Sequence, residues 1–248
     1  MTSTVEPVSF KKVLARLPRG EPLSVGTLRG FGLSEFHSSW LARNGWLERL
    51  GRDAYLVPGA DVDRDGALAY LAPRIPGLHV AGKTALAWRG VRHHLAVKER
   101  LSLWADQPAR LPPWFTARFD ARLQSTRIFD EKMSRSMGLQ PLPNGRAEIL
   151  VSVPERALLE LLSDVGKSQS LDEARQLVES LRSLRGTVLD ALLRHLTRIK
   201  VARLAELLAS QSQLPWAPVA RKHSERLGGG GRWVAVSRTG ERIDLRRH

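Results

Sequence analysis

The segment with the clearest match to a ligand-binding motif is residues 77–84, whose letters GLHVAGKT fit the phosphate-loop pattern of nucleotide-binding proteins. In such a loop, backbone amides and a lysine surround phosphate groups, and the loop joins a buried strand to a helix. Two prolines lie among the five residues before this segment, where the buried strand would have to run. We therefore expect a short strand at 78–81, a helix at 83–89, and no nucleotide bound by Lys83.

Two pairs of residues have side chains that bind metal ions in other proteins. Asp61 and Asp63 have the spacing of paired metal-binding carboxylates, but they lie in a polar segment without the glycine–serine loop of nucleotidyltransferases, so we interpret them as a solvated turn. His93 and His94 are adjacent, so their side chains point apart in a helix or strand. The sequence contains no cysteine and no spacing typical of a catalytic nucleophile. We expect no enzymatic activity, no metal and no cofactor.

The charge of the chain is more informative than these motifs. The 248 residues contain 39 Lys and Arg against 25 Asp and Glu, a formal net charge of +14, which favours a polyanionic partner such as nucleic acid. Residues 190–248 hold 12 basic against 5 acidic groups, which is half of the excess. A possible basic surface lies there, either a solvated face or a second polyanion-binding surface. Its members are Arg194, Arg198, Lys200 and Arg203.

The elements that could present DNA-binding residues are predicted within residues 1–60. Apolar spacing, a serine that can cap a helix and glycines at the turns indicate three helices followed by a hairpin. The expected bounds are helices at 7–17, 22–30 and 34–43, and strands at 46–50 and 54–57. This order is typical of a winged helix-turn-helix, a domain that places its third helix in the major groove.

The third helix has two faces of different composition. Periodicity places one group of residues on the stripe that packs inward: Leu33, Phe36, His37, Trp40 and Leu41. The opposite face carries small polar residues that fit a groove and bond to base edges, and basic residues follow at the helix end and hairpin tip. We predict the DNA contacts to be Ser34, Ser38, Ser39, Arg43, Arg49 and Arg52. The alternative is that this domain contacts a protein.

The rest of the chain is expected to form a larger domain, residues 67–248, after a polar linker at 58–66. Serine–glutamate patterns at 152–155 and 170–173 predict capping boxes, and Thr187 a further helix start. Helices are expected at 67–74, 156–162, 174–184, 188–198 and 201–209, strands at 100–105, 117–129 and 148–153, a rigid loop at 111–115, and a hairpin at 232–237 and 241–245. The predicted fold is α+β: an N-terminal winged helix-turn-helix followed by a mixed α+β domain with a C-terminal helical bundle.

The sequence also indicates where the protein works. No apolar run reaches the ~20 residues of a membrane-spanning helix, and the first residues lack the basic and apolar regions of a signal peptide. We expect a cytoplasmic protein without a membrane partner.

Several ordered segments resemble the AbiEi-type antitoxins of bacterial type IV toxin–antitoxin systems. They are GLS at 32–34, GWLERLGR at 45–52 with Tyr55, HVAGKTAL at 79–86 with His94 and Leu95, LPPWF at 111–115, SVPERALLE at 152–160 and IKVARL at 199–204. The resemblance implies an N-terminal winged helix that represses the antitoxin–toxin operon by binding double-stranded DNA at promoter repeats. It also implies a C-terminal domain that neutralises a nucleotidyltransferase-like toxin without forming a stable complex with it. The alternative is a stand-alone transcriptional regulator without a toxin partner.

Overall fold

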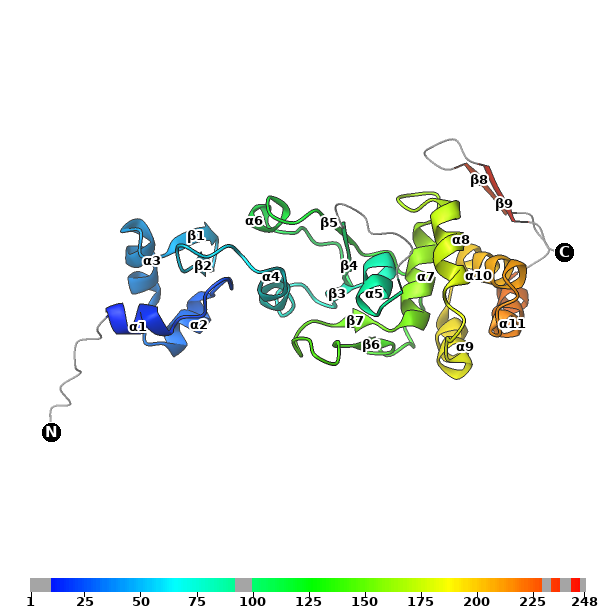
Figure 1. Ribbon diagram of the computed structural model, residues 1–248, viewed down its shortest axis with the longest axis horizontal. Helices are drawn as coiled ribbons and strands as arrows, with labels where there is room; N and C mark the ends of the chain where they lie inside the picture. The colour runs from blue at the N-terminus through cyan, green and yellow to red at the C-terminus, as the bar shows by residue number, and fades with distance from the viewer. Residues whose placement is uncertain (1–9, 92–99, 229–232, 237–241, 246–248) are drawn as a thin grey trace. The chain divides into compact units, whose positions relative to one another are not determined.

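The computed structural model (Figure 1) describes residues 10–91, 100–228, 233–236 and 242–245, and it has the predicted mixture of helices and sheets. Contacts divide the chain into two compact units: unit 1 is residues 1–75 with 110–119, and unit 2 is residues 76–109 with 120–248. His93 and His94 lie outside the described residues. Within the described part of the chain, no helix is long and apolar enough to cross a membrane.

Unit 1 begins with the predicted order of three helices and a hairpin. The helices are α1 (Phe10–Arg16), α2 (Val25–Gly30) and α3 (Glu35–Arg43), and the hairpin strands are β1 (Glu48–Gly51) and β2 (Ala54–Leu56). Leu23 extends the hairpin, because its backbone exchanges two hydrogen bonds with Tyr55, at 2.7 and 2.9 Å. Gly45 has φ 76°, the left-handed conformation expected of a glycine that ends a helix.

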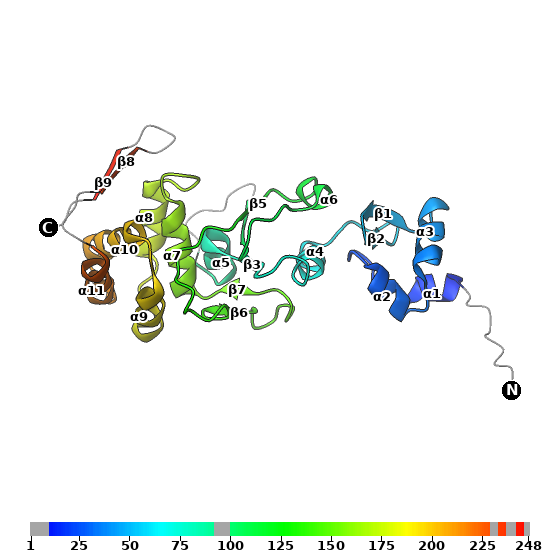
Figure 2. The ribbon, with the colours of Figure 1, turned by 180° about the vertical axis from the view of Figure 1, so that it is seen from behind.

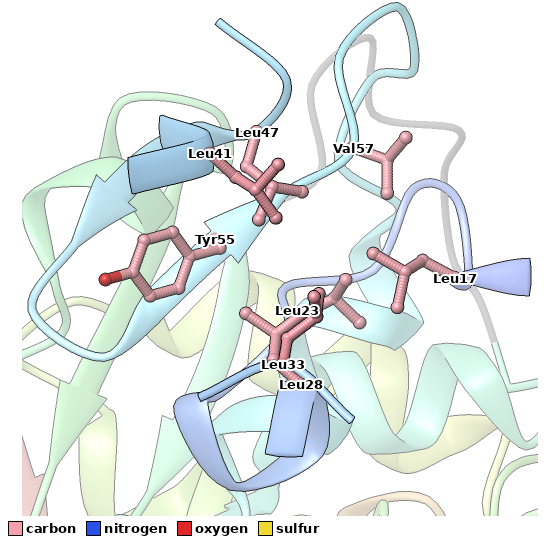
Figure 3. Close-up of a cluster of buried hydrophobic side chains, with 8 residues drawn as sticks. All are labelled: Leu17, Leu23, Leu28, Leu33, Leu41, Leu47, Tyr55 and Val57. Carbon is pink, nitrogen blue, oxygen red and sulfur yellow. The ribbon is translucent and has the colours of Figure 1, made fainter. Parts of the chain in front are cut away.

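The core of unit 1 is a cluster of buried side chains that lie in or next to helices α1, α2 and α3 and the hairpin (Figure 3). Its members are Leu17, Leu23, Leu28, Leu33, Leu41, Leu47, Tyr55 and Val57. Of the residues predicted to pack inward from the third helix, only Leu33 and Leu41 belong to this cluster. The prediction was wrong for Phe36 and Trp40, whose side chains are exposed.

Two further helices complete unit 1. They are α4 (Arg64–Leu71), which overlaps the helix predicted at 67–74 but begins inside the predicted linker, and α6 (Pro113–Thr116), where a rigid loop was expected. Asp63 caps α4 by accepting a 2.8 Å hydrogen bond from the Gly66 amide, so it is a helix cap and not a solvated turn. The boundary between the two units follows residue 75, so it lies beyond the predicted linker. Residues after that linker belong to unit 1, because the Tyr70 hydroxyl donates to the Asp53 carbonyl at 2.6 Å and the Tyr70 ring packs edge-on against Trp114.

Unit 2 contains a five-stranded mixed sheet in the order β5-β4-β3-β7-β6. The central strands β3 and β7 are parallel, as are β4 and β5, whereas β3–β4 and β6–β7 are antiparallel. The bounds are β3 (His79–Val80), β4 (Leu101–Trp104), β5 (Ala121–Gln124), β6 (Leu139–Gln140) and β7 (Val151–Ser152). Helices α5 (Gly82–Trp88) and α7 (Pro154–Asp164) lie side by side next to this sheet (Figures 1 and 2).

The helices after the sheet pack on one another as a bundle, with α10 in contact with α7, α8 and α11. They are α8 (Leu171–Glu179), α9 (Gly186–His195), α10 (Ile199–Gln211) and α11 (Ala217–Leu227). The final hairpin pairs β8 (Trp233–Val236) with β9 (Arg242–Leu245), as predicted. Helix α11 was not predicted, because its inner face is only weakly apolar, with Ala220, His223 and Ser224 buried. Pro218 in its first turn was the available signal.

Two of the three predicted helix caps in unit 2 are wrong. Ser170 does cap α8, since its hydroxyl oxygen accepts from the Glu173 amide at 3.1 Å. Helix α7, in contrast, starts at Pro154 without a side-chain cap, because Ser152 is hydrogen-bonded to Glu160 instead. Helix α9 starts at Gly186, before Thr187.

Candidate nucleic-acid interface

The exposed side of α3 is the first part of the candidate interface. Ser34 fixes the start of the helix, because its hydroxyl oxygen accepts a 3.2 Å hydrogen bond from the His37 amide. Leu41 packs inward, and the residues on the other side of the helix are exposed, except for the half-buried Ser39. We call these residues the α3 outer face: Glu35, Phe36, Ser39, Trp40 and Arg43. This face combines aromatic, hydroxyl and cationic groups with one carboxylate, that of Glu35.

Two of the predicted contact residues on α3 behave differently from one another. Ser38 is fully buried, and its hydroxyl donates a 2.9 Å hydrogen bond to the Ser34 carbonyl. The prediction that Ser38 reaches a base edge is therefore wrong: its side chain lies between α3 and the core. Arg43 is exposed at the end of the helix, where its Nε lies 3.4 Å from the Ser39 carbonyl.

The hairpin presents the second part of the interface. Arg49 in β1 and Arg52 in the turn are exposed, and within the described residues neither has an ion-pair partner. The turn is held to α2, because the carboxylate of Asp53 accepts a 2.7 Å hydrogen bond from the Val25 amide and pairs with Arg74 at 3.1 Å. Two cations without ion-pair partners in the described residues thus lie on a hairpin whose turn is fixed to α2.

The predicted C-terminal basic surface is not a single exposed face. Arg203 is buried, with 8% of its surface accessible. The Lys200 ammonium points inward at the carbonyls of Ser163 and Val165, and burial lowers its pKa to about 8. Arg194, paired with Asp190, and Arg198, bonded to the Arg127 carbonyl, remain exposed. The prediction is therefore corrected to two exposed arginines.

In residues 77–84, the segment that matches the phosphate-loop pattern, several polar groups are bonded to other groups of the protein. The amide of Gly82, at the start of α5, donates to the Glu160 carboxylate at 3.1 Å. The amides of Val80 and Ala81 are bonded to sheet carbonyls, both at 2.9 Å. Lys83 pairs with Glu173 at 2.9 Å. The segment is the predicted strand leading into a helix, and three of its amides are bonded to other groups of the protein.

We accordingly expect the full-length chain to show no micromolar affinity for ATP or GTP in isothermal titration calorimetry. Lys83→Ala should leave this result unchanged and cost less than ~1 kcal/mol of stability, because the Lys83–Glu173 pair is well exposed. Tight ATP or GTP binding that Lys83→Ala abolishes would contradict this interpretation.

Sequence analysis missed the buried polar network around Glu160. The carboxylate accepts hydrogen bonds from four groups of the sheet and of helices α5 and α7: His79 Nε2 (3.1 Å), the Gly82 amide (3.1 Å), the Ser152 hydroxyl (2.8 Å) and Arg156 Nε (2.8 Å). Burial alone would raise the pKa of Glu160, but the charges and hydrogen bonds of His79 and Arg156 lower it to about 2. The available signal was an arginine and a glutamate four residues apart within an apolar helix.

Comparisons with known proteins cover nearly the whole chain. Residues 98–245 match the family model described as transcriptional regulator, AbiEi antitoxin, type IV TA system, and residues 7–97 match that of the AbiEi antitoxin N-terminal domain. The crystal structure of the RV2827C protein from Mycobacterium tuberculosis has a similar fold, with a TM-score of 0.58 and 14% identity over 91% of this chain and 86% of that chain. No curated protein matches the chain.

Proposed function

This chain belongs to the AbiEi antitoxin family of transcriptional regulators of type IV toxin–antitoxin systems, and from this premise we propose that it binds duplex DNA as a winged helix-turn-helix repressor of its own operon. In this proposal α3 enters the major groove and the β1–β2 hairpin is the wing. The observation that carries it is the pair Arg49 and Arg52, exposed on a hairpin whose turn is held to α2 and without ion-pair partners in the described residues.

The proposed contacts divide into two kinds. Ser34, Ser39 and Arg43 lie on or beside the α3 outer face and are assigned to the groove, whereas Arg49 and Arg52 are assigned to phosphates. Phosphate contacts position a protein on the duplex without reading sequence, and they release counterions. The two kinds of contact therefore differ in how a substitution changes the salt dependence of binding.

Replacing both wing arginines, Arg49→Ala with Arg52→Ala, should lower the slope of log affinity against log salt concentration by about 2, about 1 for each lost phosphate contact. The probe is a labelled duplex from the region upstream of the chain's own gene, titrated with full-length protein by fluorescence anisotropy. The matched control is Lys132→Ala with Arg182→Ala, which removes the same charge from exposed positions of unit 2. Equal salt slopes for the wing variant and wild type would remove the wing from the interface.

We further propose that unit 2 carries the activity that neutralises a nucleotidyltransferase-like toxin, without a stable complex between the two proteins. This proposal extends the family's description as antitoxins. The exposed arginines Arg194 and Arg198 are the part of the C-terminal basic cluster available to a polyanion or an acidic partner. They are the positions that we would test first for neutralisation.

A further inference from the structure

The α3 outer face has an unusual composition for a helix that meets a polyanion. In the described part of the chain, large hydrophobic side chains are exposed at three positions, Phe36 (69%), Trp40 (40%) and Trp46 (47%). Phe36 and Trp40 are four residues apart in α3, so they lie one above the other on the same face. Ser39 and Arg43 lie beside them on that face. Two apolar side chains thus lie on the face of α3 that would contact the base pairs in the major groove.

A duplex fits this face better than a second copy of the chain does. In a two-fold symmetric contact the same patch meets itself, so Arg43 can pair only with Glu35 of the second copy. The α3 outer face then offers no further carboxylate to the exposed wing arginines of either copy. DNA brings phosphates to those cations and presents both polar and apolar groups to the helix.

The apolar group that DNA offers in the major groove is the C5-methyl of thymine. The other features of base edges in that groove are hydrogen-bond donors and acceptors, which a phenyl or indole face cannot satisfy. We propose that Phe36 and Trp40 are specificity-determining residues that pack against thymine C5-methyl groups in the operator. This inference rests on the proposed function, and it names the chemical group that the α3 outer face selects.

The proposal predicts how much affinity is lost for each thymine methyl group that is removed. Burial of one methyl-sized apolar group corresponds to a factor of about 4 in affinity. Replacing a contacted thymine by deoxyuridine removes that methyl and leaves base pairing and the phosphate backbone intact. Wild-type protein should therefore bind about fourfold more weakly for each contacted thymine that is replaced. Because no phosphate contact is lost, the salt slope should stay the same.

The experiment uses the full-length chain and a labelled duplex that it selects from a random library. Each thymine of the selected site is replaced in turn by deoxyuridine, and affinities are measured by fluorescence anisotropy. Phe36→Ala should bind the thymine duplex more weakly and lose its response to deoxyuridine at one or two positions, while Phe36→Leu should keep part of it. Trp46→Ala is the control, because Trp46 is comparably exposed but lies outside α3. It should respond to deoxyuridine as wild type does.

Three results would overturn the inference. The first is equal wild-type affinity for thymine and deoxyuridine at every position, with the salt slope still dependent on the wing arginines; this leaves the proposed function standing. The second is a self-associating wild type, seen by sedimentation velocity, that Phe36→Ala makes monomeric without changing the deoxyuridine response; the face then binds a second copy. The third is failure to select any duplex, which removes the proposed function as well.

Discussion

Glu160→Gln is expected to destabilise unit 2 by about 3–5 kcal/mol, because it removes one partner from a buried charged network. The wild-type carboxylate accepts hydrogen bonds from His79, Arg156, Ser152 and the Gly82 amide. An amide can satisfy only part of this set, and it leaves the guanidinium of Arg156, whose side chain is 8% exposed, without its anionic partner. Urea denaturation followed by far-ultraviolet circular dichroism would measure the loss.

The same network predicts a pH dependence with a definite sign. The pKa of Glu160 is about 2 in the folded protein against an ordinary value of 4.5. Since the folded pKa is the lower one, the carboxylate's contribution is fully present above the ordinary value and is lost as pH falls from about 4.5 towards 2. The difference in unfolding free energy between wild type and Glu160→Gln should therefore be largest near neutral pH and shrink through that interval.

A matched control is the same substitution at a solvent-exposed glutamate. Glu131 pairs with Arg127 at 3.4 Å, and its side chain is 92% exposed. Glu131→Gln should change stability by no more than ~0.5 kcal/mol. If Glu160→Gln is as stable as Glu131→Gln, or if its deficit does not depend on pH, the carboxylate is not the charged centre of this network.

Local signals were enough to predict the three helices and the hairpin at the start of unit 1. The Ser34 cap and the left-handed Gly45 each depend on a few neighbouring residues, and both are present as predicted. The inward stripe failed at Phe36 and Trp40, because periodicity assigns apolar residues to the core by default. An apolar residue kept on the surface cannot be distinguished by spacing alone.

Partners that are distant in sequence account for most of the other errors. Ser152 and Glu155 have the letters of a capping box, but Ser152 bonds to Glu160, and Glu155 holds the amide and guanidinium of Arg185, 30 residues away. His79 and Glu160 are 81 residues apart and meet only because β3 pairs with β7. No local pattern contains these contacts, so the network became visible only in the fold.

Because unit 1 extends to residue 75 and includes residues 110–119, the separation of the two proposed activities is better tested by surface substitutions than by truncation. A truncation to residues 67–248 would remove the first three residues of α4 with its cap Asp63, and it would remove the Asp53 carbonyl to which the Tyr70 hydroxyl donates. A charge at Trp40 would not unpack unit 1 either, because that side chain is 40% exposed. Surface substitutions in the full-length chain avoid both problems, since they remove charges without opening a core.

We expect the wing variant, Arg49→Ala with Arg52→Ala, to lose repression while still protecting cells from the cognate toxin. Each arginine–phosphate contact is worth about a tenfold change in affinity, so the double variant should leave its promoter largely unoccupied. Arg194→Ala with Arg198→Ala should show the opposite result, with repression retained and protection weakened. A promoter reporter measures the first activity, and growth during co-expression with the proposed nucleotidyltransferase-like toxin measures the second.

The two double variants remove the same charge, so each is the control for the other. If the wing variant also loses protection although it is abundant and folded, neutralisation depends on DNA binding and the activities are not separable. If Arg194→Ala with Arg198→Ala protects as well as wild type, these arginines are not the neutralising surface. If wild type represses its promoter but does not protect cells, the chain is a stand-alone regulator, because repression by unit 1 requires nothing from a toxin.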